Sequence, residues 1–230
     1  MPLYLYLLIG SLIVPLLYSI FFNDFIKYWK EFSISTIGVA ALFLIWDYYF
    51  TKAGIWGFNY DYCVGLKIFE MPIEEWLFFI IIPFCSLFIH FAFLHVLPIA
   101  YLNKKTTYMI SLILIIISVY LLVMNDTKSY TLASFMILIL TILYGLLYHR
   151  PLLQKFYITF LIILIPFFII NGTLTGSFIE SPIVWYNNKE NLGIRLTTIP
   201  IEDIAYCFSL LFGNLMIFEK LKFNKIKRNT

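Results

Sequence analysis

The chain has 230 residues, of which 62% are hydrophobic, 20% aromatic and only 13% charged. Soluble globular domains carry about 25% charged residues, so the composition excludes a soluble domain and predicts a polytopic membrane protein. The formal net charge of +3 gives no reason to expect a nucleic-acid partner, and none is predicted.

Seven apolar segments are long enough to cross a bilayer as helices, which takes about 20 mostly apolar residues. The first segment has no basic residues ahead of it and no small-residue cleavage site, which favours a retained span over a signal peptide. The connections 51–72 and 172–198 are long, and the others are short. The predicted fold is all-α, with seven transmembrane helices at about 3–22, 33–50, 73–96, 107–124, 130–148, 155–171 and 199–218.

Lysine and arginine are unevenly divided between the two ends of these spans. Eleven of the 16 basic residues fall on one side, several of them in the C-terminal tail, and the five others fall on the side of the long connections. Basic residues resist translocation, so the richer side is predicted to be cytoplasmic. The sequence therefore predicts a multi-pass protein of the cell membrane, with its N-terminus and both long connections outside and its C-terminus in the cytoplasm.

A short acidic motif occurs twice, as Pro-Ile-Glu-Glu at 72–75 and as Pro-Ile-Glu-Asp at 200–203. Each copy opens the third span of a set of three, and a glycine precedes each by the same spacing, Gly65 and Gly193. The span at 107–124 carries the chain back across the bilayer, so the second set of three starts on the same side as the first. The two sets therefore run parallel, and both motifs face the same side. The predicted organisation is a three-helix repeat at 1–98, a linker helix at 99–128 and a second three-helix repeat at 129–230.

The carboxyls of the two motifs are the candidate catalytic groups. Proline suits the first position of a helix, and acids in a first turn are favoured by the helix dipole, which explains a single motif without any function. Carboxyls at a membrane border are costly, however, and the motif is repeated. Two adjacent acids can share one proton, so that one donates while the other accepts. The predicted catalytic residues are Glu74, Glu75, Glu202 and Asp203.

Further motifs complete a resemblance to a known family. The dipeptide Trp-Asp at 46–47 and the tripeptide Trp-Gly-Phe at 56–58 precede the first acidic motif, and Asn-Gly-Thr-Leu-Thr at 171–175 and Trp-Tyr at 185–186 precede the second. Together with the doubled PxE(E/D) motif, they resemble the membrane-integral lycopene cyclase domain of bacteria, archaea and fungi. The resemblance covers almost the whole chain and matches the form in which two three-span domains are fused.

The resemblance implies a carotenoid-biosynthesis isomerase that uses no cofactor and acts on lycopene dissolved in the bilayer. A carboxylic acid would protonate C2 of a linear ψ end group, the C5–C6 alkene would close on the resulting C1 cation, and a base would remove the C6 proton to leave a β-ionone ring. Repeated at the other end, the reaction converts lycopene to β-carotene through γ-carotene. Glu74 and Glu202 are the leading acid candidates, with Glu75 and Asp203 as bases or orienting partners.

Several other residues are expected to bind the substrate or support the acids. The polar ones are explained by helix capping as well as by catalysis, and Arg195 could hold Glu202 or Asp203 ionised. Aromatic faces stabilise a carbocation, and Tyr206 closely follows the second motif. Asp47 has no acidic counterpart in the second half, so the halves form either inequivalent sites or one composite site. The supporting residues are predicted to be Pro72, Pro200, Asp47, Trp56, Asn171, Thr175, Arg195 and Tyr206.

Other classes of membrane protein fit the sequence less well. A microbial rhodopsin needs a lysine in its last span, and 199–218 has none. A polyprenyl transferase needs aspartate-rich boxes and a flavin-dependent cyclase needs a GxGxxG fingerprint, and neither pattern occurs. A small proton-coupled transporter that uses the paired carboxyls is the alternative that stays open. Also open are a β-, ε- or γ-ring, cyclisation of one end or both, and a homo-oligomer or an association with other carotenoid enzymes.

Overall fold

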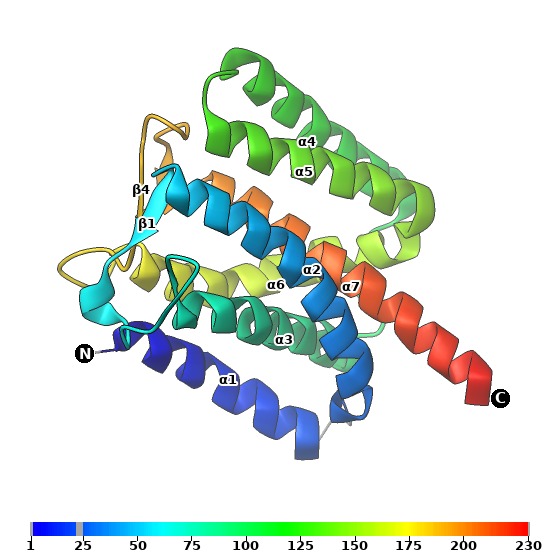
Figure 1. The fold of residues 1–230 in the computed structure, drawn as a ribbon. Coiled ribbons are helices and arrows are strands. Elements are labelled where there is room, and N and C mark those ends of the chain that lie inside the picture. Colours follow the sequence, from blue (N-terminus) through cyan, green and yellow to red (C-terminus); the bar gives the residue numbers. More distant parts are fainter. Residues whose placement is uncertain (1, 22–24, 230) are drawn as a thin grey trace.

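The computed structural model describes residues 2–21 and 25–229. Within this part of the chain, all seven predicted spans are confirmed as helices, and with them the all-α polytopic membrane fold (Figure 1). Position 22, the last of the first predicted span, lies outside the described residues. The helices are α1 (Leu3–Phe21), α2 (Trp29–Lys52), α3 (Ile73–Val96), α4 (Lys104–Met124), α5 (Ser129–Tyr148), α6 (Arg150–Leu174) and α7 (Glu202–Asn229).

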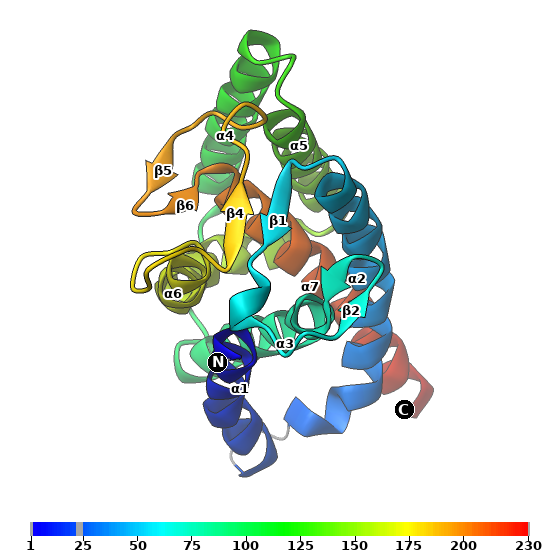
Figure 2. The same ribbon diagram turned by 60° about the vertical axis from the view of Figure 1, so that its left-hand side comes forward.

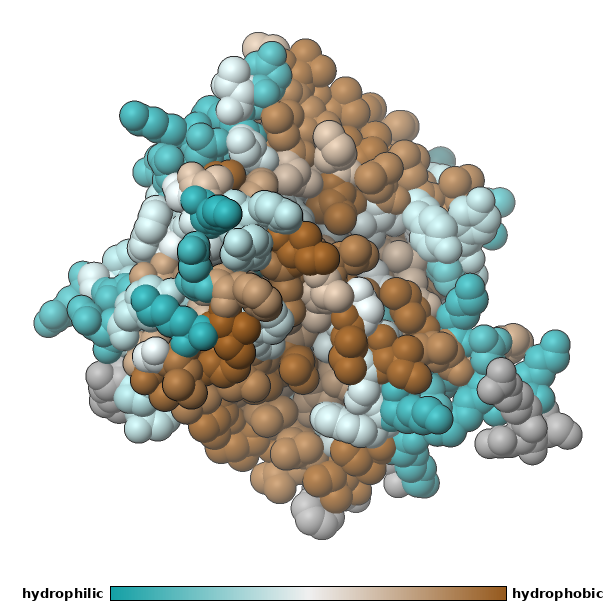
Figure 3. Space-filling view, in the orientation of Figure 1, coloured by the Kyte–Doolittle hydropathy of each residue, from teal (hydrophilic) through white to brown (hydrophobic). Residues whose placement is uncertain are grey.

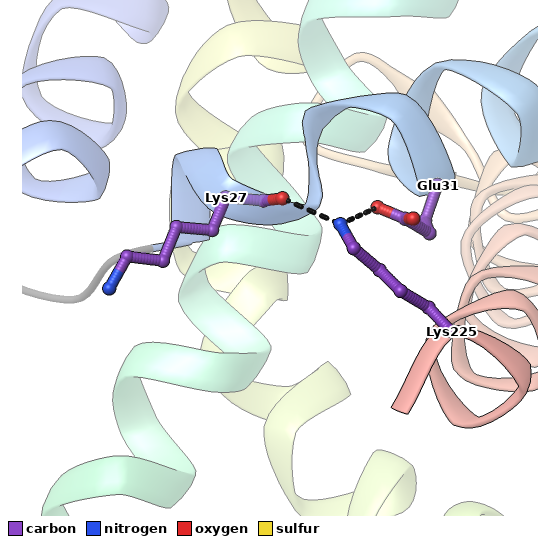
Figure 4. Close-up of polar contacts among 3 residues, drawn as sticks. All are labelled: Lys27, Glu31 and Lys225. Carbon is purple, nitrogen blue, oxygen red and sulfur yellow. Dashed lines mark hydrogen bonds and ion pairs between the residues drawn. The ribbon is translucent and has the colours of Figure 1, made fainter. Parts of the chain in front are cut away.

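The last helix differs most from its predicted span. It begins at Glu202 rather than at 199, and it continues through the basic C-terminal tail. Lys225 Nζ donates a hydrogen bond to the carbonyl oxygen of Lys27 (3.0 Å) and forms an ion pair with Glu31 (3.1 Å), as Figure 4 shows. These contacts attach the end of α7 to the short helical turn η1 (Phe25–Tyr28) and to the first turn of α2.

The helices of the two halves make equivalent contacts. α1 and α2 both pack on α3, and α5 and α6 both pack on α7. Between the halves, α2 packs on α7 as α6 packs on α3. The contacts therefore follow a two-fold pseudo-symmetry that relates α1, α2 and α3 to α5, α6 and α7, whereas α4 lies outside this pattern and packs mainly on α5 (Figure 1). The domain boundaries near residues 98 and 128 stay a prediction.

The two long connections contain short strands that the sequence analysis did not predict. β1 (Trp56–Phe58) from the first connection pairs antiparallel with β4 (Val184–Tyr186) from the second. Each connection then ends in a small hairpin. Figure 2 shows the strands together over one end of the bundle, so the loops of the two halves cover the same end. The hairpins join β2 (Lys67–Ile68) to β3 (Met71–Pro72) and β5 (Arg195–Leu196) to β6 (Ile199–Pro200).

The prolines of the acidic motifs precede the helices instead of opening them. Pro72 has an extended conformation (φ −65°, ψ 149°) and is the last residue before α3, and Pro200 ends the strand β6. The prediction that proline occupies the first helical position is therefore wrong, because each proline closes a hairpin strand. The acidic residues of both motifs still lie in the first turns of α3 and α7, where backbone N–H groups have no partner within the helix.

The surface of the bundle is suited to a bilayer. Many large hydrophobic side chains are exposed, above all on α4, where they include Leu112, Ile116 and Val123. In Figure 3, hydrophobic residues form a broad zone across the middle of the face shown, and hydrophilic residues gather toward the two ends. Exposed apolar area of this extent is rare on soluble monomers, so it indicates that lipid covers these helices.

Candidate active site

A cavity of about 360 Å³ lies inside the bundle and reaches both acidic motifs. Its apolar part lies between α1, α3 and α6, and its polar end lies beside β1 and β4. The volume falls within the range of small-molecule sites, about 300–1,000 Å³. No group of three or more potential metal-ligating side chains occurs in the described part of the chain. The carboxyls and phenols that line the cavity are Tyr4, Asp47, Glu75, Tyr130, Tyr186, Asp203 and Tyr206.

The first half contributes two adjacent carboxyls to this cavity. Tyr4 Oη donates to Glu75 Oε2 (2.6 Å), and Trp56 Nε1 donates to Asp47 Oδ1 (2.6 Å). Both carboxyls are buried, and they are close enough for their charges to interact. Asp47 therefore joins Glu75 in one acidic pair, with Tyr4 and Trp56 fixing the orientation of the two side chains.

The second half contributes one carboxyl, which accepts three hydrogen bonds. Tyr130 Oη donates to Asp203 Oδ1 (2.5 Å), and both Tyr186 Oη (3.0 Å) and Asn171 Nδ2 (3.1 Å) donate to Oδ2. Hydrogen bonds donated to a carboxylate stabilise its ionised form. The pKa of Tyr186, in the loop region, is raised well above its usual value by burial and then by the charge of Asp203, so this phenol stays protonated and keeps its role as a donor.

The two carboxyl clusters are variants of one arrangement. Tyr4 and Tyr130 are each the second residue of the first helix of their half, and each donates to the carboxyl of its own half. Asp47 near the end of α2 and Asn171 near the end of α6 hold corresponding places beside those carboxyls. One cluster therefore has two acids and the other has an acid and an amide, and the structure places both in a single cavity.

The first glutamate of each motif has a different environment from the second. Glu74 Oε1 accepts a hydrogen bond from the backbone N–H of Val64 (2.6 Å), and Glu202 Oε1 accepts from the N–H of Leu192 and from Thr131 Oγ1 (both 2.8 Å). Both glutamates are completely buried, and neither lines the cavity. The second oxygen of each has no hydrogen-bond partner among the described residues. These two glutamates hold the loops against their helices.

The contact with the loop explains why glycine precedes proline by the same spacing in both halves. Gly65 and Gly193 come directly after the two backbone N–H donors and have φ angles of 95° and 73°. L-residues with a side chain avoid this left-handed region, whereas glycine adopts it at little cost. Each glycine therefore lets the connection turn so that the preceding N–H points at a glutamate.

The remaining predicted site residues divide into two groups. Trp56 and Tyr206 line the cavity, as do Asp47 and Asn171, whereas Pro72, Pro200, Thr175 and Arg195 do not. Thr175 Oγ1 is hydrogen-bonded to the carbonyl oxygen of Asn171 (2.8 Å) and to Thr198, so it caps the end of α6.

Arg195, which was expected to hold Glu202 or Asp203 ionised, makes its hydrogen bonds to other residues. Its guanidinium donates to the carbonyl oxygen of Thr198 (2.6 Å) and to Asn188 Oδ1 (2.7 Å), and it lies 5.7 Å from the ring centre of Tyr186. Its positive charge nevertheless acts on Asp203, and Tyr186, which donates to Asp203, lies between the two side chains.

Residues 2–93 and 127–221 match the family model described as lycopene cyclase. The chain belongs to the lycopene cyclase family. The matched residues include both acidic motifs, and the unmatched stretch 94–126 contains α4. No curated protein and no solved structure matches the chain.

Family membership confirms the resemblance seen in the sequence and assigns the cyclase to carotenoid biosynthesis. Its substrate is lipid-soluble, which agrees with an apolar cavity inside a membrane bundle. The match gives no support to the proton-coupled transporter, the alternative that the sequence left open.

Three residues of the candidate site were not among its predicted residues: Tyr4, Tyr130 and Tyr186, the last of which belongs to the Trp-Tyr motif of the resemblance. Each donates a hydrogen bond to Glu75 or Asp203. A signal for two of them exists, since a tyrosine is the second residue of the first helix in both halves. Among 17 tyrosines, that signal appears only after the two halves have been aligned on their helix starts.

Proposed function

We propose that this lycopene cyclase forms β-ionone rings at the linear ψ ends of lycopene, using carboxyls from both halves on one end group. The observation that carries the proposal is that Glu75 of the first half and Asp203 of the second line the same cavity. The reaction adds one proton and removes another, so it requires no net oxidation or reduction and, in this proposal, no redox cofactor.

Glu75 is the proposed acid, with Asp47 as its partner. Two adjacent carboxyls in a site shielded from water hold one proton between them, because two like charges cannot both be stabilised there. That proton passes to C2 of the ψ end group and leaves a cation at C1. Glu74 and Glu202 were the acids expected from the sequence, but both are hydrogen-bonded to the loops and neither lines the cavity.

Asp203 is the proposed base. The electrons of the C5–C6 alkene form the C6–C1 bond and move the cation to C5, and loss of the C6 proton then restores the C5–C6 double bond. Asp203 accepts three hydrogen bonds, which favour a carboxylate that can take this proton. A base that reached the C4 proton instead would give an ε-ring, so the position of the base determines the product.

Aromatic rings around the carboxyls are suited to stabilising the intermediate cations. Trp56 lies 5.1 Å from the ring centre of Tyr130 and 6.4 Å from that of Tyr206, and Tyr130 stacks on Tyr186 at 5.7 Å. The negative face of an aromatic ring attracts a cation within about 6 Å. The ring faces of Trp56, Tyr186 and Tyr206 are thus suited to stabilising a cation that forms beside the carboxyls.

The proposal is tested by pigment chromatography of a lycopene-accumulating bacterial host. We expect β-carotene with the unmodified chain, and unreacted lycopene with Glu75→Gln or Asp203→Asn. Glu74→Gln is the matched control, because glutamine keeps the oxygen that accepts from Val64. It is expected to cyclise lycopene in proportion to the amount of inserted protein.

Two outcomes would contradict the proposal. Normal cyclisation by Glu75→Gln together with its loss in Glu74→Gln would return the acid role to the first glutamate. An ε- or γ-ring product from the unmodified chain would overturn the assignment of the C6 proton to Asp203.

A further inference from the structure

The cavity reaches the lipid-facing surface between α1 and α6. Val14 on α1 and Ile169 on α6 both line the cavity, yet 59% of the surface of Val14 and 57% of that of Ile169 are exposed. Both residues lie within spanning segments. Val14 lies near the middle of α1, and Ile169 lies two residues before Asn171, which contacts Asp203. The mouth of the cavity therefore opens to the hydrocarbon region of the bilayer at the middle of α1, and it extends along α6 toward the carboxyls.

The pseudo-symmetry predicts a second mouth between α2 and α5, but that region is filled. Val39, Phe43, Phe79 and Leu210 pack there as one buried cluster, and Phe79 is only 1% exposed. The position equivalent to Phe79 in the second half, at the repeat offset of the two motifs, is Cys207, which lines the open cavity. A phenylalanine fills on one side the space that a cysteine leaves free on the other.

We propose that the cyclase has a single lateral portal, between α1 and α6, through which one end of lycopene enters from the lipid while the rest of the chain stays in the bilayer. This inference rests on the proposed function and adds the path by which the substrate reaches the carboxyls. With the equivalent cleft filled, the second end can reach the same carboxyls only through this portal. The carotenoid therefore leaves after the first ring forms, and its monocyclic form exchanges with the membrane pool before the second ring is made.

The portal is tested by narrowing it. Val14→Trp places a large ring at the mouth, and Leu140→Trp is the matched control, since Leu140 is also 59% exposed and lies on α5, the pseudo-symmetric partner of α1. For purified protein in lipid vesicles containing lycopene, we expect Val14→Trp to lower the initial rate by about tenfold or more. Leu140→Trp is expected to leave the rate unchanged. The proposal of a single portal would be overturned if Val14→Trp kept the rate of the unmodified chain, or if both variants lost the same share of it.

Release of the intermediate is tested by isotope dilution in the same vesicles. Carbon-13-labelled lycopene is converted until the monocyclic product is present, and an excess of unlabelled monocyclic carotenoid is then added. If the intermediate exchanges with the bilayer, the label in the bicyclic product falls in proportion to the dilution. Undiluted label in the bicyclic product would show that both rings form in one binding event and would overturn the proposal. Failure of the unmodified chain to cyclise lycopene would instead contradict the proposed function.

Discussion

Neighbouring carboxyls on one helix have different environments because successive side chains point about 100° apart around the axis, as 3.6 residues per turn require. In the first turn of α3, this rotation directs Glu74 at the loop and Glu75 into the cavity. In the first turn of α7 it does the same for Glu202 and Asp203. The contact with the loop and the access to the cavity are therefore divided between the two acids of each motif.

The hydrogen bond from Tyr130 to Asp203 is expected to matter for the chemical step. Tyr130→Phe removes a donor to a buried carboxylate, and a hydrogen bond to a charged group contributes about 1.5–3 kcal/mol. We predict that the variant lowers kcat by roughly tenfold or more, with a smaller change in KM. Steady-state rates in lycopene-containing vesicles measure both constants.

The matched variant Tyr4→Phe removes the corresponding donor from Glu75. If Glu75 is the proton donor, this change is expected to reduce kcat less than Tyr130→Phe, because the acid delivers its proton from the neutral form. A larger loss in Tyr4→Phe, at equal thermal stability of the two variants, would reverse the assignment of acid and base.

At the scale of elements, the pairing of β1 with β4 joins the two halves above the cavity. A methyl group on Gly57 would overlap the indole ring of Trp185, which is its partner across the strand pair. We predict that Gly57→Ala lowers the midpoint of thermal unfolding and reduces the rate of cyclisation, because the strand that carries Trp56 must shift. Gly10→Ala, where a methyl group meets no neighbour, is the control: it is expected to leave the rate unchanged and not to lower the midpoint, since alanine favours the helix α1 more than glycine does. An unchanged melting temperature for Gly57→Ala would show that Trp185 moves away freely.

The spanning helices were predictable from the sequence because each is a long apolar run, as between 73 and 96, and this signal depends on no other part of the chain. The strands were not, because β1 is three residues long and is stabilised by β4, more than a hundred positions away. The same limit applies to the site. The sequence identified Glu75 and Asp203 by their repeat, but which acid faces the cavity depends on the rotation of α3 and α7 in the bundle.

At the scale of the whole molecule, we propose that the loop-covered end faces the outside of the cell and that α7 ends in the cytoplasm. The proposal is supported by the excess of lysine and arginine at the end opposite the loops. Green fluorescent protein at the C-terminus is expected to fluoresce, and alkaline phosphatase fused within the connection 125–128 is expected to be active. Activity of a phosphatase fused to the C-terminus would show that the orientation is the opposite of the one proposed.

The cavity takes its carboxyls from both halves, so neither half alone contains all of them. The first half supplies Asp47 and Glu75 and the second supplies Asp203, while α2 packs on α7 and α3 packs on α6 across the boundary between them. These contacts do not depend on the connection that leads into α4. We predict that two separate chains, 1–98 and 99–230, cyclise lycopene when they are produced together.

Each chain produced alone is expected to leave lycopene unchanged, because it lacks either the proposed acid or the proposed base. Pairing 1–98 carrying Glu75→Gln with unmodified 99–230 is the control, and it is expected to be inactive although the helix contacts are retained. Cyclisation by one chain alone would show that a single three-helix set forms a complete site. The composite cavity would then not be the catalytic unit, and the two-fold pseudo-symmetry would instead relate two independent centres.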